Sequence, residues 1–184
     1  MNIKVTKLTD VELLRRANSF TTGHESKMSL AMAYRLGHSP IRTQLFWVEL
    51  REIPLFVASQ LVRQHVGVQF FQKSHRPDRN PDAKDEGRMT PTDLAFIINA
   101  EALINMAHKR LCGKASRETR EVVKAICELV EEQDPDLYQH LVPQCVYRGG
   151  ICPENKCCGY IASEKGQSRL KFYKALFNQK NNSK

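Results

Sequence analysis

The stretch TQLFWVELR at residues 43–51 alternates between large apolar side chains and other residues. The alternating apolar residues share one face, which predicts a strand with one buried face: Phe46, Val48 and Leu50. Pro54 then suits the first turn of a helix that leads into Arg63 and has an apolar face: Leu55, Ala58, Leu61 and Val62. Because a strand period gives way to a helix period, the chain must pack helices against a sheet.

Other segments extend this pattern. IKVTKL near the start alternates and predicts a first strand, while the pattern of apolar residues predicts helices at 10–20, at 25–37 with Gly37 closing it, at 92–111 and at 115–132. The charged, proline-containing segment 76–88 predicts a loop. The order of elements predicts the fold class α+β.

The charge of the chain restricts its partners. A net charge of +8 over 184 residues favours anionic partners, which include nucleotides, polyanionic cofactors and nucleic acid. The length predicts one domain. No segment approaches the roughly 20 apolar residues of a membrane span, and the first residues lack an apolar signal core, so we expect a cytoplasmic protein without a membrane partner.

Residues 60–79, QLVRQHVGVQFFQKSHRPDR, combine cationic side chains with apolar ones. Three arginines and two histidines flank the apolar run VGVQFF. The planar guanidinium of arginine recognises phosphate through two parallel hydrogen bonds, and apolar neighbours can hold a flat ring. An anion that carries rings is therefore one candidate ligand, although the phenylalanines equally suit a hydrophobic core.

Two blocks, residues 37–76 and 98–121, resemble the flavin-dependent thymidylate synthases, the ThyX family. The first contains a turn with histidine and proline, a strand, a helix and then a Ser-x-Arg motif; the second, INAEALINMAHKRLCGKASRETRE, resembles the later helix pair of the family. With RRANSF near the start, the resemblance covers roughly residues 1 to 140. It implies a mixed antiparallel sheet packed with long helices. Residues 1–144 would form the catalytic domain, and residues 145–184 a cysteine-containing loop and basic tail of the same domain.

The resemblance also implies a reaction. ThyX enzymes transfer a one-carbon unit from methylenetetrahydrofolate to C5 of dUMP and complete the methyl group of dTMP with a hydride from FAD, which NADPH reduces. The cofactors supply the difficult chemistry, while the protein binds, orients and polarises. The family forms homotetramers whose sites are built from several subunits. We therefore expect a deoxypyrimidine monophosphate, a folate and FAD as ligands.

Site residues follow from the same matches. The resemblance implies that Ser74 and Arg110 act on the nucleotide as catalytic residues, and that four residues bind it: Ser74, Arg76, Arg88 and Arg110. For the flavin it implies Arg63, Gln64, His65, Asn99 and Asn105. Arg88 precedes a loop that is shorter here than in the family. Without the resemblance, an arginine in a basic chain is usually a solvated surface group, and an asparagine in an apolar helix only needs a hydrogen-bond partner.

This sequence departs from the family at the flavin signature. The family has Arg-His-Arg with seven residues before the serine, whereas this chain has Arg63, Gln64 and His65 with eight residues before Ser74. Arg42 and Thr43 replace a Glu-His pair, and Lys114 replaces a histidine. An altered flavin site exposes the hydride step, so hydroxymethyl transfer to dUMP or dCMP is an alternative outcome on the same fold.

The segment CVYRGGICPENKCCGY lies beyond the resemblance. Its thiols are numerous enough for a tetrahedral zinc site, but their spacing is not that of paired zinc knuckles: Cys145, Cys152, Cys157 and Cys158. We predict reduced cysteines and no metal, and give Cys112 only a minor place as a nucleophile. An alternative of another class is a non-catalytic basic protein that binds zinc through this loop and nucleic acid through residues 165–180. We do not expect nucleic acid as a partner, because that charge more often belongs to a solvated helix face.

Overall fold

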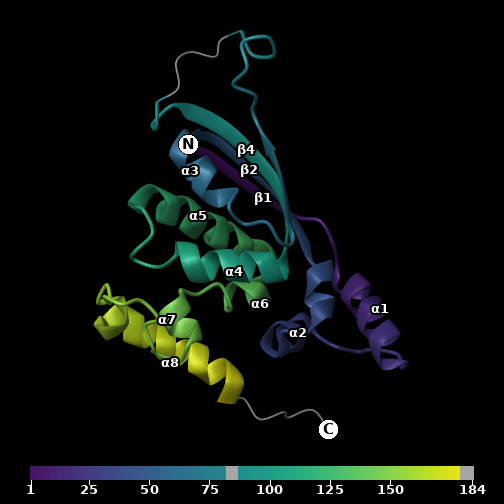
Figure 1. Ribbon diagram of the computed structural model, residues 1–184. Helices are drawn as coiled ribbons and strands as arrows, with labels where there is room; N and C mark the ends of the chain where they lie inside the picture. The colour runs from purple at the N-terminus through teal and green to yellow at the C-terminus, as the bar shows by residue number, and fades with distance from the viewer. Residues whose placement is uncertain (82–86, 179–184) are drawn as a thin grey trace.

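A computed structural model describes residues 1–81 and 87–178 of the chain. Four strands in this part form one antiparallel sheet in the order β1-β2-β4-β3 (Figure 1). Their bounds are β1 Asn2–Lys7, β2 Leu45–Pro54, β3 Val68–Gln72 and β4 Pro91–Asn99. The predicted α+β class is confirmed, and every strand pair is antiparallel.

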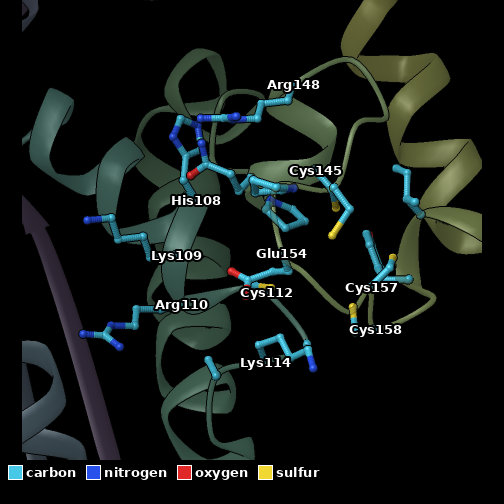
Figure 2. Close-up of a pocket in the computed structure, with 18 residues that line it drawn as sticks. His108, Lys109, Arg110, Cys112, Lys114, Cys145, Arg148, Glu154, Cys157 and Cys158 are labelled. Atoms are coloured by element: carbon cyan, nitrogen blue, oxygen red, sulfur yellow. The ribbon is translucent and has the colours of Figure 1, made fainter.

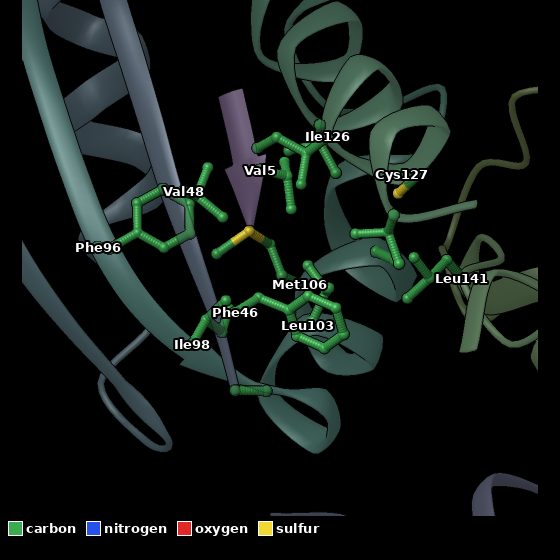
Figure 3. Packing of buried hydrophobic residues seen from close by; sticks show 14 of the residues in the cluster. Val5, Phe46, Val48, Phe96, Ile98, Leu103, Met106, Ile126, Cys127 and Leu141 are labelled. Carbon is green, nitrogen blue, oxygen red and sulfur yellow. The ribbon is translucent and has the colours of Figure 1, made fainter. Parts of the chain in front are cut away.

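Three helices cover one face of the sheet. They are α3 (Leu55–Leu61), α4 (Ala100–Arg110) and α5 (Arg117–Gln133). Helix α5 packs on β1, α3 on β2 and β4, and α4 on β4. The sheet contributes Phe46, Val48 and Phe96 to the core between these layers, and the helices contribute Leu103, Met106 and Ile126 (Figure 3). The predicted buried face of residues 43–51 is confirmed, since Phe46, Val48 and Leu50 are all buried.

The N-terminal helices begin and end at residues that suit caps. Helix α1 (Val11–Thr22) has Asp10 at its N-cap, and α2 (Leu30–Leu36) has Ser29, each accepting a backbone N–H. The second helix is shorter than the predicted 25–37 because Ser29 starts it. A short 3-10 helix, Ser39–Thr43, leads into β2.

A buried polar contact ties β1 to the end of α5. Lys7 Nζ lies 2.7 Å from Asp134 Oδ2, and the Tyr34 hydroxyl donates to the same oxygen at 2.7 Å. Burial, followed by the charge of Asp134, raises the pKa of Tyr34, so its proton stays on the hydroxyl. Asp134 also caps α6 (Pro135–Tyr138).

The C-terminal segment forms a smaller cluster of its own. It contains α7 (Gln144–Tyr147), a 3-10 helix at Tyr160–Ala162 and α8 (Glu164–Asn178), which lie together in Figure 1. Their apolar residues bury one another: Val142, Cys145, Val146, Leu170 and Tyr173. Most of the tail predicted at 165–180 is therefore helical, and residues 179–180 lie outside the described residues. No described helix combines the length and the apolar composition needed to cross a membrane.

The predicted helix at 92–111 is wrong over its first half. Residues 91–99 form β4, which pairs with β2 on one side and β3 on the other. The buried residues alternate along it, as a strand with one covered face requires: Thr92, Leu94, Phe96 and Ile98. The helix α4 starts only at Ala100, because Asn99 accepts the backbone N–H of Ala102 at 2.9 Å and caps it.

The β3 strand was not predicted, because the apolar run at residues 66–71 was interpreted only as possible ring contacts or core. Within the predicted loop 76–88, no described residue is in a helix or strand, and residues 82–86 lie outside the described part of the chain. Predicted helix 115–132 is present as α5.

Replacing the cap of α4 should destabilise the protein. We expect Asn99→Ala to lower the free energy of unfolding by about 0.5–2 kcal/mol, since it leaves the Ala102 N–H without its partner. Asn99→Ser keeps an accepting oxygen and should lose less. Urea unfolding of both variants checks this, and equal losses would show that the side chain acts in another way.

Candidate functional site

The predicted site residues lie in two groups, one near the start of β4 and the other along the end of α3, the end of β4 and α4. Near the start of β4 lie Ser74, Arg76 and Arg88. Lys73, which precedes Ser74, donates its backbone N–H to the carbonyl of Asp93 in β4. Phe56, at the start of α3, donates its backbone N–H to the carbonyl of Arg88. Near the end of β4, Asn99 N–H donates to the Gly67 carbonyl, close in sequence to Arg63, Gln64 and His65. A nine-residue strand spans roughly 30 Å, which separates Ser74 and Arg76 from Asn99, whereas Arg88 contacts Phe56, seven residues before Arg63.

The second group contains two arginines whose charges interact. Arg110, the last residue of α4, donates from Nη2 to the Gln60 carbonyl at 2.5 Å. Burial, and then the nearby charge of Arg63, lower the pKa of Arg110. Among the described residues, neither guanidinium has an acidic partner within 4.0 Å. Two such cations without a carboxylate attract an anion.

Gln60 fixes the position of Arg110 and was missed by sequence reasoning. Its side-chain Oε1 accepts from Thr119 Oγ1 at 2.8 Å and from Ser116 Oγ at 3.2 Å. Its backbone carbonyl accepts from Arg110. One residue thus joins α3, the end of α4 and the start of α5. The signal in the sequence was weak, because a single glutamine near the end of an apolar helix is unremarkable.

The first group forms a turn after β3. Arg76 N–H donates to Ser74 Oγ at 3.3 Å, and Asn80 Nδ2 donates to the Ser74 carbonyl at 3.2 Å. The guanidinium of Arg76 makes two bonds to Asp78, at 2.9 and 2.8 Å, with 66% of its side chain exposed. The Ser74 hydroxyl therefore shapes the turn, and Arg76 presents a charge that an external anion can reach.

The remaining predicted residues have simpler surroundings. The guanidinium of Arg88 lies over the Phe56 ring, 4.3 Å from its centre. Gln64 Nε2 donates to the Val66 carbonyl at 3.3 Å. Asn105 is exposed on α4, and Asn99 is the helix cap described above. The predicted helix at 92–111 contained both asparagines, which is wrong for Asn99 because it caps α4.

A pocket of about 530 Å³ lies between the end of α4 and the cysteine-containing segment (Figure 2). Its charged lining is mostly cationic, with one carboxylate, Glu154, against Lys109, Arg110, Lys114 and Arg148. It has the size of a small-molecule site. The cysteines that line it come from two distant parts of the sequence: Cys112, Cys145, Cys152, Cys157 and Cys158. Sequence reasoning had grouped only the last four.

The alternative of a zinc site gains no support from this arrangement. Across residues 1–81 and 87–178, no group of three or more histidine, cysteine, aspartate and glutamate side chains is placed to hold a metal ion. All six cysteines are free thiols. Burial raises the pKa of Cys127 to about 12, so that thiol is inert in the core.

Two buried histidines make stability depend on pH. Burial, with a smaller effect of His140, lowers the pKa of His108 to about 4, and burial lowers that of His140 to about 4. The unfolded chain binds these protons near pH 6.5, so stability present above that pH is lost as pH falls towards 4. We expect His140→Gln to weaken this loss and exposed His24→Gln to leave it unchanged, measured by urea unfolding across this range. Equal pH slopes in the two variants would contradict the assignment.

Comparisons with known proteins show which fold these elements form. No protein-family model matches the chain, and no curated protein matches its sequence. Solved structures do match. The flavin-dependent thymidylate synthase ThyX from Helicobacter pylori, complexed with FAD and dUMP, has a TM-score of 0.66 and 14% identity, covering 77% of this chain and 100% of that one. A second structure of the Helicobacter pylori enzyme with FAD and dUMP gives a TM-score of 0.62 at 14% identity, over 77% of this chain and 99% of that one. This chain therefore has a fold similar to that of ThyX.

Proposed function

We propose that this chain is a flavin- and folate-dependent enzyme that transfers a one-carbon unit to C5 of a deoxypyrimidine monophosphate, most simply dUMP to dTMP. The observation that carries the proposal is the pair Arg63 and Arg110, which has no acidic partner in the described chain, on a fold similar to that of proteins complexed with FAD and dUMP. Both ligands carry phosphates, and paired guanidinium groups suit such anions.

We infer that the donor set would hold a flavin dinucleotide near the end of α3. Arg63, with Gln64 and His65 after it, would hold the pyrophosphate, and exposed Asn105 on α4 would donate to the flavin. Bound FAD, reduced by NADPH, would supply the hydride that completes the methyl group. Asn99 would serve the site indirectly, because its side chain holds the start of α4.

The nucleotide would bind through the first group and Arg110. Ser74 would keep the turn in shape, while Arg76 exchanges its contact with Asp78 for the nucleotide phosphate. Arg88 would add charge, and its place over Phe56 limits its movement. Arg110, held by the Gln60 carbonyl, would donate to the pyrimidine or its phosphate and so polarise the acceptor.

We also propose that sites are completed between subunits of a homotetramer. Ser74 and Arg76 lie near the start of a nine-residue strand and Asn99 lies at its end, so a second copy would bring further residues to the ligand that each end binds. Size measurement in solution by light scattering tests this part. A stable monomer with full flavin and nucleotide binding would contradict it.

Flavin and nucleotide binding test the proposal directly. Purified protein titrated with FAD should retain flavin through gel filtration, and dUMP should bind the flavin-loaded protein. Arg63→Ala should weaken FAD binding by about 10- to 150-fold, the loss of one charge-assisted contact. Exposed Arg16→Ala on α1 should bind as the wild type does. Protein that binds neither ligand would overturn the proposal.

Two other functions remain as outcomes of such tests. Hydroxymethyl transfer to dUMP or dCMP is motivated by Gln64 and His65 at the flavin signature, and the product nucleotide distinguishes it. A zinc- and nucleic-acid-binding protein would instead be colourless, contain zinc and bind DNA with a steep salt dependence.

A further inference from the structure

Cys152 and Cys157 form a thiol pair in the wall of the pocket. They end the short segment CPENKC, both line the pocket, and each thiol shifts the pKa of the other. The Gly159 N–H donates to Cys157 Sγ at 3.4 Å. Gly159 has φ +83°, a left-handed conformation that favours glycine at this position. A backbone N–H thus helps to fix the Cys157 sulfur in the wall of the pocket.

The two thiols differ in their surroundings. Cys157 is exposed, whereas Cys152 is half-buried against the C-terminal cluster. The Gly159 N–H first, then the Cys152 thiol, lower the pKa of Cys157, and Lys114 acts in the same direction. An exposed sulfur near a cation and backbone N–H groups is the environment of a reactive cysteine.

The other thiols that line the pocket have different surroundings. Cys158 packs against Gly113, where an added Cβ would lie 2.9 Å from its sulfur. Cys145 is a buried residue of α7, and burial raises its pKa. Cys112 lies just beyond α4, near Cys145 and Cys152. Cys152 is the thiol that lies at the other end of the CPENKC segment and shifts the pKa of Cys157.

We propose that Cys152 and Cys157 are a redox-active dithiol, in which Cys157 attacks a disulfide substrate and Cys152 resolves the product. The Cys157 thiolate forms a bond to one sulfur of the substrate and breaks its S–S bond, which releases one thiolate. Cys152 then loses its proton and attacks Cys157 in the mixed disulfide, releasing the second thiolate. The two cysteines give up two electrons and two protons, and the substrate disulfide becomes two thiols.

The expected substrate is a small or peptide disulfide that can enter a cationic pocket. Lys109, Lys114 and Arg148 line that pocket, so a substrate with carboxylates is favoured. Oxidised glutathione has both features and serves as the probe. The Cys152–Cys157 disulfide would close the CPENKC segment on itself and fix one wall of the pocket.

Reaction of the reduced full chain with oxidised glutathione tests the proposal. Mass spectrometry should show the loss of two hydrogens, with peptide mapping placing the disulfide between Cys152 and Cys157. Cys152→Ser should stop at a mixed disulfide of glutathione on Cys157. Cys157→Ser should lose both products, and the adjacent exposed control Cys158→Ser should form the disulfide as the wild type does.

Several results would overturn the proposal. One is a disulfide in which Cys158, Cys112 or Cys145 replaces Cys152 or Cys157. Others are the absence of any disulfide, or a rate of reaction with oxidised glutathione that is unaltered in Cys157→Ser. Stoichiometric zinc or iron in the purified chain would likewise overturn it, because the thiols would then be metal ligands. None of these outcomes depends on flavin or nucleotide binding.

Discussion

Phe46→Ala should lower the free energy of unfolding by about 3–5 kcal/mol, the usual cost of removing a buried phenylalanine ring. The Phe46 side chain is fully buried, on a strand that pairs with β1 on one side and β4 on the other. It packs between the sheet and α4 in the main core. Its removal leaves a cavity that two paired strands prevent from collapsing.

Urea unfolding of a matched pair measures this effect. Phe20 on α1 is 90% exposed, so Phe20→Ala should change stability by less than about 0.5 kcal/mol. Similar losses in the two variants would contradict the placement of Phe46 at the centre of the core.

Arg76→Ala should weaken binding of dUMP by about 10- to 150-fold, because a charge-assisted bond to phosphate contributes about 1.5 to 3 kcal/mol. The structure adds a condition to this prediction. Arg76 pairs with Asp78 through two hydrogen bonds, so the phosphate must displace that carboxylate. Asp78→Asn should therefore leave dUMP binding equal or tighter. Lysine at position 76 should restore only part of the affinity, since a point charge lacks the planar fork.

The matched control is Arg79→Ala, which removes an exposed arginine from the same turn. It should bind dUMP as the wild type does, and all of these variants should keep the wild-type unfolding transition. Calorimetric titration beside thermal unfolding makes the comparison. Wild-type affinity in stably folded Arg76→Ala would remove Arg76 from the nucleotide site.

The spacing of apolar residues predicted the strands and helices in which that spacing was regular. The alternation around Phe46 predicted β2, and the apolar pattern of residues 115–132 predicted α5. The segment 91–110 was misjudged because strand β4 runs directly into helix α4 without a loop, and both halves are apolar. Its Asn99 was interpreted as an interruption of a helix, whereas it is the cap at the junction.

The site was harder to predict because its contacts are long-range. The Arg110 contact with Gln60 joins residues 50 positions apart, and Cys112 reaches the later cysteines only through the packing of α4 against α7. The spacing of these residues in the sequence gives no information about either contact. The resemblance identified Arg63 and Arg110 separately, but only the fold showed that one perturbs the pKa of the other.

The most direct test of the proposed function is the identity of the product nucleotide. The purified chain is incubated with FAD, NADPH, methylenetetrahydrofolate and either dUMP or dCMP, and the nucleotide is analysed by mass spectrometry, with Arg110→Ala as a control that should lose turnover. We predict that dUMP gains one methyl group. A hydroxymethyl group in its place would support the alternative reaction, and an unaltered nucleotide with flavin and substrates present would contradict the proposal of a one-carbon transferase.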